Sequence, residues 1–454
     1  MPNSMKLSRT QFARTLRAAM LVTAVAILPA STAGIAAVDG RASAQFGKLI
    51  AIYQLVKENY VEEVDDDKLF RGAIDGMLAS LDPHSSYLDG SSLQRLETMI
   101  DGNYSGLGLS VQMEDGAVKV ISPFKGSPAE KAGIKAGDYI THLDGELYFE
   151  RDLDEAVERM RGKAGTSIRL TIFRPGRTSD FDVTVTRGVI ELEPVTWELE
   201  GDVGVISVNE FSRDVGKDVL AGIRDLQSKA PGGLSGLVLD LRSNPGGSLD
   251  EAVALSDLFL ARGDIVSQRG RNNRDDEYYR AESMFKGDVA ANLPMVVLID
   301  AGSASASEIV AGALQDHKRA VIMGERSFGK GSVQSLIGLD RTSAVKMTTA
   351  RYYTPKGKSV QEGGIDPDIR VPQLSDPDAR LRSERAVRES DLRGHLINEA
   401  SLEDKQLETD KREDPRFTAT AEELKAQDIE DFQLHYAVQT LRRAGAATTL
   451  AKRR

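Results

Sequence analysis

A serine and a lysine that lie 25 residues apart are the side chains of this 454-residue chain whose surroundings best suit covalent chemistry. Ser305 follows an apolar run at 295–299 and a small-residue turn, and it precedes an almost wholly apolar stretch at 306–314 that predicts a helix. A hydroxyl in that place lies beside the free N–H groups of a helix N-terminus, which can receive an oxyanion. The pattern therefore suits a nucleophile at a strand–turn–helix junction.

The same residues have a simpler interpretation. Ser305 and Glu308 have the S-x-x-E spacing of a capping box, in which each side chain satisfies the backbone N–H of the other residue. On these residues alone the cap is the better interpretation, because caps are common and nucleophiles are rare. A nucleophilic serine also requires a base that takes its proton.

Lysine supplies the better candidate for that base. The chain has no cysteine, which excludes Cys-His chemistry, and none of its five histidines has a context that signals a Ser-His-Asp site. Lys330 lies between glycines, after an apolar run at 320–323 and before a strand-like run at 332–337. In an apolar site desolvation disfavours the ammonium and lowers the pKa of a lysine, so Lys330 can serve as the base of a Ser-Lys pair.

A phosphate-binding P-loop is a rival interpretation of the segment around Lys330. The spacing of Gly324, Gly329 and Lys330 matches G-x-x-x-x-G-K. The match then fails, because Gly331 stands where a P-loop has Ser or Thr, and because the next residues predict a strand where a P-loop begins a helix. Nucleotide binding is therefore weakly supported.

The segments around Ser305 and Lys330 resemble those of the carboxy-terminal processing, or tail-specific, serine peptidases. The similar segments are GSASASE at 302–308, GE at 324–325 and FGKG at 328–331, with Gln334 just beyond them. The resemblance implies that Ser305 is the nucleophile, Lys330 the general base and Gln334 the residue that orients the lysine. Glu308 matches an acidic position of less settled role.

An NPGG turn at 244–247 follows a predicted strand at 234–241 and also has a chemical interpretation. Glycine lets a backbone N–H approach a substrate closely, whereas proline has no N–H. In the resembling family a glycine amide at this turn and the amide after the nucleophile form the oxyanion hole. The resemblance thus implies Ala306 together with Gly246 or Gly247, although such a turn alone is more often only a turn.

Residues 97–188 resemble a PDZ domain, which binds an extended C-terminus by strand addition. The markers are YSGLGLSV at 104–111, GSPAEKAGIKAGD at 126–138 and an LDG hairpin signal at 143–145. GLGL alone would mark only a tight turn. We expect the loop of Gly106, Leu107, Gly108 and Leu109 to bind the peptide, with its amides on the carboxylate and the two leucines lining the apolar pocket. Arg161 is a candidate for coupling peptide binding to the active site, although a solvated charge is the simpler interpretation.

Strand and helix patterns alternate from about 190 to 373 and predict an α/β layered core, for which the resemblance implies a crotonase-like fold. The predicted fold class is a multidomain α/β protein with an inserted PDZ domain and helical N- and C-terminal segments, the last with Gly445 as a helix stop. We predict a signal peptide at 1–44, a helical segment at 45–96, a PDZ domain at 97–188, a serine peptidase core at 189–373, and a charged linker with a C-terminal helix at 374–454.

Charge and the N-terminus bear on the compartment and on partners. The formal net charge of −11 gives no electrostatic footprint for nucleic acid. Basic residues precede a 13-residue apolar run at 18–30, and an A-x-A sequence follows at 42–44, which predicts an export signal and a periplasmic or secreted protein. Cleavage after Ala37 and an uncleaved membrane anchor are the alternatives, although the run is short for a bilayer.

The combined prediction is a serine endopeptidase that cleaves periplasmic proteins or peptides recognised by their C-terminal tails. No metal or cofactor is expected, because no HExxH sequence or clustered ligand set is present. The alternative is a non-catalytic PDZ adaptor on a degenerate peptidase body. The sequence leaves open the natural substrate, an activating periplasmic lipoprotein as adaptor, and assembly as a monomer or a homo-oligomer.

Overall fold

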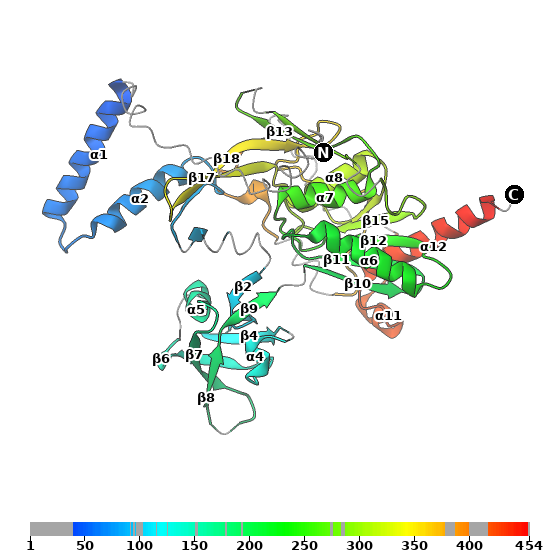
Figure 1. Cartoon of the computed structure of the whole chain (residues 1–454), viewed down its shortest axis with the longest axis horizontal. Coiled ribbons are helices and arrows are strands. Elements are labelled where there is room, and N and C mark those ends of the chain that lie inside the picture. The colour runs from blue at the N-terminus through cyan, green and yellow to red at the C-terminus, as the bar shows by residue number, and fades with distance from the viewer. Residues whose placement is uncertain are drawn as a thin grey trace, which may run out of the picture. The chain divides into compact units, whose positions relative to one another are not determined.

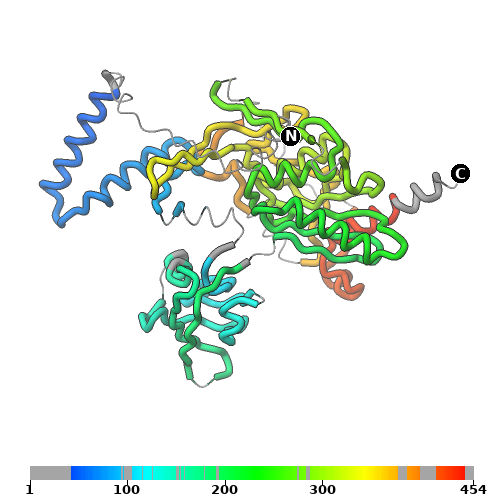
Figure 2. Tube along the Cα trace, in the orientation of Figure 1, coloured from blue at the N-terminus to red at the C-terminus, as the bar shows by residue number. Residues whose placement is uncertain are grey.

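The structure is a computed structural model in which the chain forms two compact units (Figures 1 and 2). It describes residues 40–90, 92–93, 96, 103–114, 116–124, 126–149, 153–177, 179–191, 194–272, 276–282, 287–376, 386–398 and 416–452. Most of the predicted signal peptide and of the charged linker lies outside these residues. Within them, no helix combines the length and the apolar character that crossing a membrane requires.

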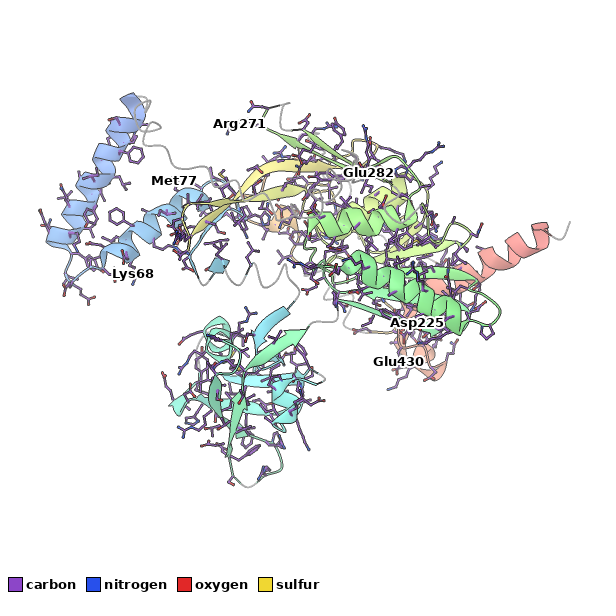
Figure 3. The ribbon with its side chains drawn as sticks, viewed as in Figure 1. Lys68, Met77, Asp225, Arg271, Glu282 and Glu430 are labelled. Atoms are coloured by element: carbon purple, nitrogen blue, oxygen red, sulfur yellow. The ribbon has the colours of Figure 1, made fainter. Side chains whose placement is uncertain are left out.

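The first unit contains the N-terminal helices and a small antiparallel sheet. Its elements are α1 (Gly40–Asn59), α2 (Asp66–Ala79), β1 (Ser86–Leu88), β17 (Ser332–Gly338) and the first part of β18 (Ala344–Tyr353). Asp65 caps α2, since its side chain accepts from the N–H groups of Asp67 and Lys68. Both β1 and β17 pair with β18. Many apolar side chains of α1 and α2 are exposed, among them Met77 (Figure 3).

The second unit includes a compact β domain where the sequence resembles a PDZ domain. Its elements are β2 (Asn103–Gly106), β3 (Leu109–Glu114), β4 (Ala117–Pro123), α4 (Pro128–Lys131), β5 (Tyr139–Leu143), β6 (Glu146–Leu147), α5 (Leu153–Met160), β7 (Ser167–Phe173), β8 (Phe181–Thr186) and β9 (Gly188–Glu191). The strand order is β3-β4-β5-β7-β8, with β6 paired to β5 and with β2 paired to β9. Asp144 and Gly145 both have positive φ, as a two-residue hairpin turn of the predicted kind requires.

The same unit contains an α/β core. Its elements are β10 (Val195–Glu200), β11 (Val203–Val208), α6 (Val215–Lys229), β12 (Gly236–Asp240), α7 (Leu249–Phe259), β13 (Asp264–Gly270), β14 (Glu277–Arg280), β15 (Met295–Ile299), α8 (Ala306–Asp316), β16 (Val321–Gly324), β19 (Ile369–Arg370), η3 (Glu389–Asp391), α11 (Ala421–Ala426) and α12 (Phe432–Lys452). A six-stranded sheet has the order β10-β11-β12-β15-β16-β19, and only β10 is antiparallel to its neighbour. The predicted α/β core is confirmed.

Helices cover both faces of this sheet. A Cβ atom added to Gly204 would lie 3.1 Å from Leu226 of α6, so this position faces α6. The neighbouring positions Val203 and Val205 belong to a buried cluster that also contains Val438 and Leu441 of α12. Because successive strand residues point to opposite faces, α6 and α12 lie on opposite sides of the sheet.

The C-terminal segment differs from its prediction in two ways. The predicted single helix is divided into α11 and α12, and Asp428 between them has a left-handed φ of 60°. Gly445 is not a helix stop, because α12 continues to Lys452. The structure also shows where this helix lies, since α12 packs back on the body of the protein through Ala437, Val438 and Leu441.

A half-buried ion pair attaches the start of α12 to the end of β12. Arg242 donates to Asp431 through Nη1 (3.0 Å) and Nη2 (2.7 Å) and also pairs with Asp240. Burial alone would raise the pKa of Asp431, but hydrogen bonds from Arg242 and its charge hold that pKa below the usual aspartate value. The ionised carboxylate of Asp431 therefore stabilises this junction.

We expect Asp431→Ala to lower the free energy of unfolding by about 1–3 kcal/mol, because it leaves the Arg242 guanidinium without one of its acceptors. Since the folded-state pKa is lowered, the contribution is present above the unfolded value of 3.8 and is lost as the pH falls through the folded value. Urea unfolding at pH 7 and at lower pH measures this. Lys217→Ala, which removes an exposed ion pair, is the control and should leave the free energy of unfolding nearly unchanged.

Candidate active site

Ser305 has a positive φ, unlike three other helix caps of this protein, and it shares that sign only with Asp214, the N-cap of α6 (φ 70°), among the N-caps that the structure describes. It is the N-cap of α8, with φ 54° and ψ −109°. Ser127, Ser248 and Thr420 also precede helices and have φ of −68°, −66° and −88°. A positive φ at a residue other than glycine costs about 1–3 kcal/mol and is typically retained at functional sites. Such a strained backbone is typical of a strand-to-helix turn that exposes a nucleophilic side chain.

Glu308 joins the loop of Ser305 to the loop of Lys330. Its Oε2 accepts from the backbone N–H of Ser305 (2.7 Å) and from that of Lys330 (3.0 Å). Its Oε1 accepts from the Ser327 hydroxyl (2.5 Å) and from the Gly329 N–H (2.7 Å). The Glu308 half of the predicted capping box is thus present. One carboxylate oxygen also holds the backbone of the two predicted catalytic residues side by side.

Burial of Glu308 opposes these hydrogen bonds. The residue is 1% exposed, and desolvation raises the pKa of its carboxyl to about 7, although all four donors favour the charged form. Only the carboxylate can accept from all four donors, because a proton on either oxygen occupies one acceptor position. The ionised form is therefore the one that connects the two loops.

The loop at 326–331 has fixed backbone geometry around Lys330. The Phe328 N–H donates to Ser303 O of the serine loop (3.0 Å). A Cβ atom on Gly329 (φ +97°) would lie 2.7 Å from the Glu362 carbonyl oxygen, and one on Gly331 would lie 2.5 Å from a backbone nitrogen. Both flanking glycines are therefore required by close packing. The loop leads into β17, so the P-loop interpretation is wrong, because it requires a helix here.

The NPGG turn lies against Ser305. A Cβ atom on Gly246 would be 2.9 Å from Ser305 Cβ and 3.1 Å from the Ala306 nitrogen. The Gly246 N–H already donates to Asn244 Oδ1 (2.9 Å). Gly247 has φ +142° and packs against the backbone of Phe211. Of the two glycines predicted as oxyanion-hole donors, Gly246 is therefore the one whose N–H already has an acceptor within the turn.

Sequence reasoning missed two residues that build this arrangement. Asn244 is fully buried, and its backbone carbonyl oxygen accepts from the Ala304 N–H (3.0 Å) and the Ser307 hydroxyl (2.9 Å). Asp300 Oδ1 accepts from the N–H groups of Ser243 (2.7 Å) and Gly302 (2.9 Å). Both therefore tie the NPGG turn to the serine loop. Their only sequence signal was that Asn and Asp favour turns.

Gln334 belongs to the other compact unit, on β17. There its Nε2 donates to the hydroxyls of Ser332 (3.0 Å) and Thr348 (3.2 Å). Its role in orienting Lys330 stays a prediction.

The peptide-binding loop predicted at 106–109 turns its carbonyl groups into the β domain. Leu107 O accepts from Ala129 N (2.9 Å), and Gly108 O accepts from Phe124 N (2.9 Å). In a trans peptide the N–H points away from the preceding C=O, so the amides of Gly108 and Leu109 face the other way, as a carboxylate cradle requires. A cavity of about 80 Å³ beside them is lined by Leu107, Gly108, Leu109, Val111, Val157, Met160 and Arg161.

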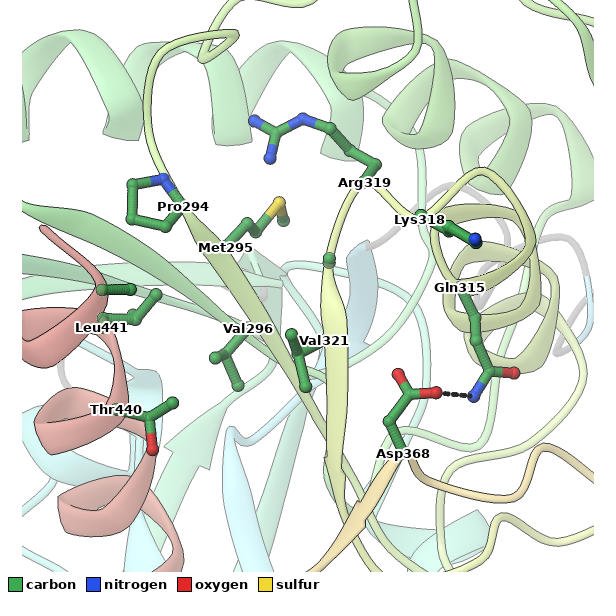
Figure 4. A pocket seen from close by; sticks show the side chains of 12 residues that line it. Pro294, Met295, Val296, Gln315, Lys318, Arg319, Val321, Asp368, Thr440 and Leu441 are labelled. Carbon is green, nitrogen blue, oxygen red and sulfur yellow. Dashed lines mark hydrogen bonds between the residues drawn. The ribbon is translucent and has the colours of Figure 1, made fainter. Parts of the chain in front are cut away.

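A second, larger cavity of about 410 Å³ does not belong to this site (Figure 4). It is lined by Pro294 and Met295 at the start of β15 and by Leu441 of α12. Ser305 follows the opposite, carboxyl end of the same strand. Among the described residues, no group of His, Asp or Glu side chains could hold a metal ion.

Parts of the chain match known protein families and individual proteins. Residues 202–371 match the family model described as peptidase family S41, residues 105–185 match that of the PDZ domain, and residues 26–92 match that of the activating protease CtpB N-terminal domain. The chain is 47% identical over 354 residues to the carboxy-terminal-processing protease of Bartonella bacilliformis, which covers 78% of this chain and 80% of that protein. It is 37% identical over 329 residues to the carboxy-terminal processing protease CtpA of Bacillus subtilis, over 72% and 69% of the two chains. The solved structure of the photosystem II D1 C-terminal processing protease is 30% identical, with a TM-score of 0.45 over 76% of this chain and 92% of that one.

We expect Glu308→Gln to lower the free energy of unfolding by about 2–4 kcal/mol, because a single amide oxygen cannot serve four donors and each unsatisfied buried donor costs about 1–3 kcal/mol. Any peptidase activity should fall by at least about tenfold, since the loops of Ser305 and Lys330 lose their shared acceptor. Chemical unfolding and peptide hydrolysis measure the two effects. The matched control is Glu423→Gln, in the exposed capping box of α11, where glutamine can still accept from the Thr420 N–H. Equal effects of the two substitutions would contradict this account.

Proposed function

Because this chain belongs to the carboxy-terminal processing proteases, serine peptidases of family S41 that carry a PDZ domain, we propose that Ser305 is its nucleophile and Lys330 its general base. The observation that carries the proposal is the Glu308 oxygen that accepts from the N–H groups of both residues. The strained φ of Ser305 supports it further, because an ordinary cap does not require that strain.

In the proposed mechanism the neutral amine of Lys330 takes the proton from Ser305 Oγ as the oxygen attacks the scissile carbonyl. The new C–O bond puts a negative charge on the carbonyl oxygen. Collapse of this intermediate breaks the C–N bond, and Lys330 returns the proton to the leaving amine. Water then attacks the acyl-enzyme while Lys330 accepts a proton from the water. Collapse of this second intermediate breaks the ester C–O bond, and Lys330 returns the proton to Ser305 Oγ as the carboxylic acid product leaves.

The proposed oxyanion hole combines the Ala306 N–H with a glycine amide from the NPGG turn. We favour Gly247 as the glycine donor, because the Gly246 N–H is engaged by Asn244. Gly246 then has a packing role, since any side chain there would meet Ser305. We propose that Gln334 orients Lys330 during the reaction, a role that rests on the resemblance alone.

We propose that the β domain recognises protein C-termini. The carbonyl groups of Leu107 and Gly108 point into the domain, which directs the next two amides toward a bound carboxylate. The apolar cavity beside them suits a small apolar last residue. The basic and apolar residues before Ala30 support export, so the substrates that we propose are periplasmic or secreted proteins.

Degradation of an unfolded protein with an apolar C-terminus tests the catalytic proposal. We expect the wild type to cleave it and both Ser305→Ala and Lys330→Ala to lose at least about 10³-fold in kcat, because each removes a member of the reacting pair. Circular dichroism checks that the variants fold. Full activity of Lys330→Ala would show that the base is wrong. An inert wild type, retested with periplasmic fractions, would distinguish a protease that requires a partner from a non-catalytic adaptor.

Replacing the last two residues of that substrate by aspartate tests the recognition proposal. We expect kcat/KM to fall by about 10–100-fold, because a carboxylate side chain would lose its hydration among Leu107, Val157 and Met160, although Arg161 also lines the cavity. Val157→Phe, which fills the cavity, should cause a similar loss for the apolar tail only. Equal cleavage of both tails by the wild type would contradict tail recognition through this pocket.

A further inference from the structure

Three consecutive carbonyl groups in the loop of Lys330 have partners from a part of the chain about 60 residues away. Arg388 Nη1 donates to the carbonyl oxygens of Arg326 (2.8 Å) and Ser327 (2.7 Å). The N–H of Glu389 donates to Phe328 O (3.3 Å). Arg326 and Ser327 are only 3% and 1% exposed, so water has little access to replace these bonds. The loop therefore depends on residues 388 and 389 for its hydrogen-bond donors.

The two donor residues are themselves buried. Arg388 is 9% exposed and Glu389 is fully buried. The backbone N–H of Arg388 donates to Asp391 Oδ2 (2.8 Å), which closes the short helix η3. Burial of a guanidinium is costly unless its N–H groups find acceptors, and the two loop carbonyls are such acceptors. The Arg388 side chain and the two loop carbonyl groups thus supply each other with hydrogen-bond partners.

A second chain of hydrogen bonds runs from Glu389 to the far side of Lys330. Glu389 Oε1 accepts from Gln361 Nε2 (3.0 Å), and Gln361 Oε1 accepts from the Gly331 N–H (3.1 Å). Asn398 Nδ2 donates to Gln361 O (2.9 Å). Gln361 is fully buried as well. The loop is thus held before Lys330 at 326–328 and after it at 331.

We infer that Arg388 and Glu389 are positioning residues for Lys330. Both lie beyond 202–371, the region that matches the peptidase family model. The inference rests on the proposed function, because it takes Lys330 as the general base. A base must lie within hydrogen-bond reach of the hydroxyl that it deprotonates, and a displacement of about 1 Å can cost about 10²-fold in rate.

The test compares Arg388→Ala, Arg388→Lys and wild type in the full chain. For Arg388→Ala we expect kcat to fall by about 10–100-fold with KM changed less than about twofold, because the residues of the peptide pocket are unchanged. The acid limb of kcat/KM against pH should shift, since a loosened loop admits water, which raises the pKa of Lys330 and lowers the pKa of the buried Glu308 carboxyl that holds the same loop. Arg388→Lys should restore part of kcat, because an ammonium also carries donors for two carbonyl groups.

Arg393→Ala, at an exposed arginine five residues further along, is the matched control and should keep wild-type kinetics and pH dependence. A folded Arg388→Ala enzyme with wild-type kcat and acid limb would overturn the inference. So would a kcat that falls only with thermal stability while the acid limb stays in place, since that result assigns Arg388 a purely structural role.

Two further variants keep the outcome decisive. Should Arg388→Ala not fold, Gln361→Met breaks the link between Glu389 and Gly331 at similar side-chain volume, and an unmoved acid limb there would overturn the inference. Lys330→Ala is measured in the same assay. If it stays active, the proposed base and this inference both fall. If it is inert while Arg388→Ala resembles wild type, only the inference falls.

Discussion

The buried carboxylate of Glu308 is the interaction on which the proposed active site depends. The loops of Ser305 and Lys330 come from different parts of the chain, and one oxygen of Glu308 accepts an N–H from each. The capping and catalytic interpretations of Ser305 are thus compatible, because Glu308 retains its capping bond while the serine backbone takes a strained conformation. The glutamate of a common helix-capping motif thus also connects two loops through its hydrogen bonds.

The order of strands explains why these loops meet. β12, β15 and β16 are adjacent and parallel, so their carboxyl ends lie at one edge of the sheet, where open α/β sheets typically bind ligands. The NPGG turn follows β12, the serine loop follows β15, and the loop of Lys330 follows β16. Asn244 and Asp300 then fix the first two loops to each other. The three loops of the proposed active site are thus short connections that follow adjacent strands of a regular sheet.

Local signals were readable from the sequence, and distant ones were not. The apolar run at 295–299 forms β15 with the same bounds, and the helix predicted after Ser305 begins at Ala306, because apolar patterning is a local property. Gly445 was misread as a stop, because one glycine costs a helix only about 1 kcal/mol. The roles of Gln361 and Arg388 depend on partners about 30 and 60 residues away, which no short pattern encodes. The catalytic assignment itself came from resemblance, because the residues alone favoured a cap.

The distance in sequence between the loop of Lys330 and η3 has a consequence for the order in which the protein matures. A ribosome makes residues 326–331 well before residues 388 and 389, and until these arrive three carbonyl groups of the loop lack their partners. The nascent chain then contains every proposed reacting group without the support that holds them. The loop of Lys330 can therefore reach its final geometry only after residues 388 and 389 have been added, so the proposed reacting pair is present in the chain before it is positioned.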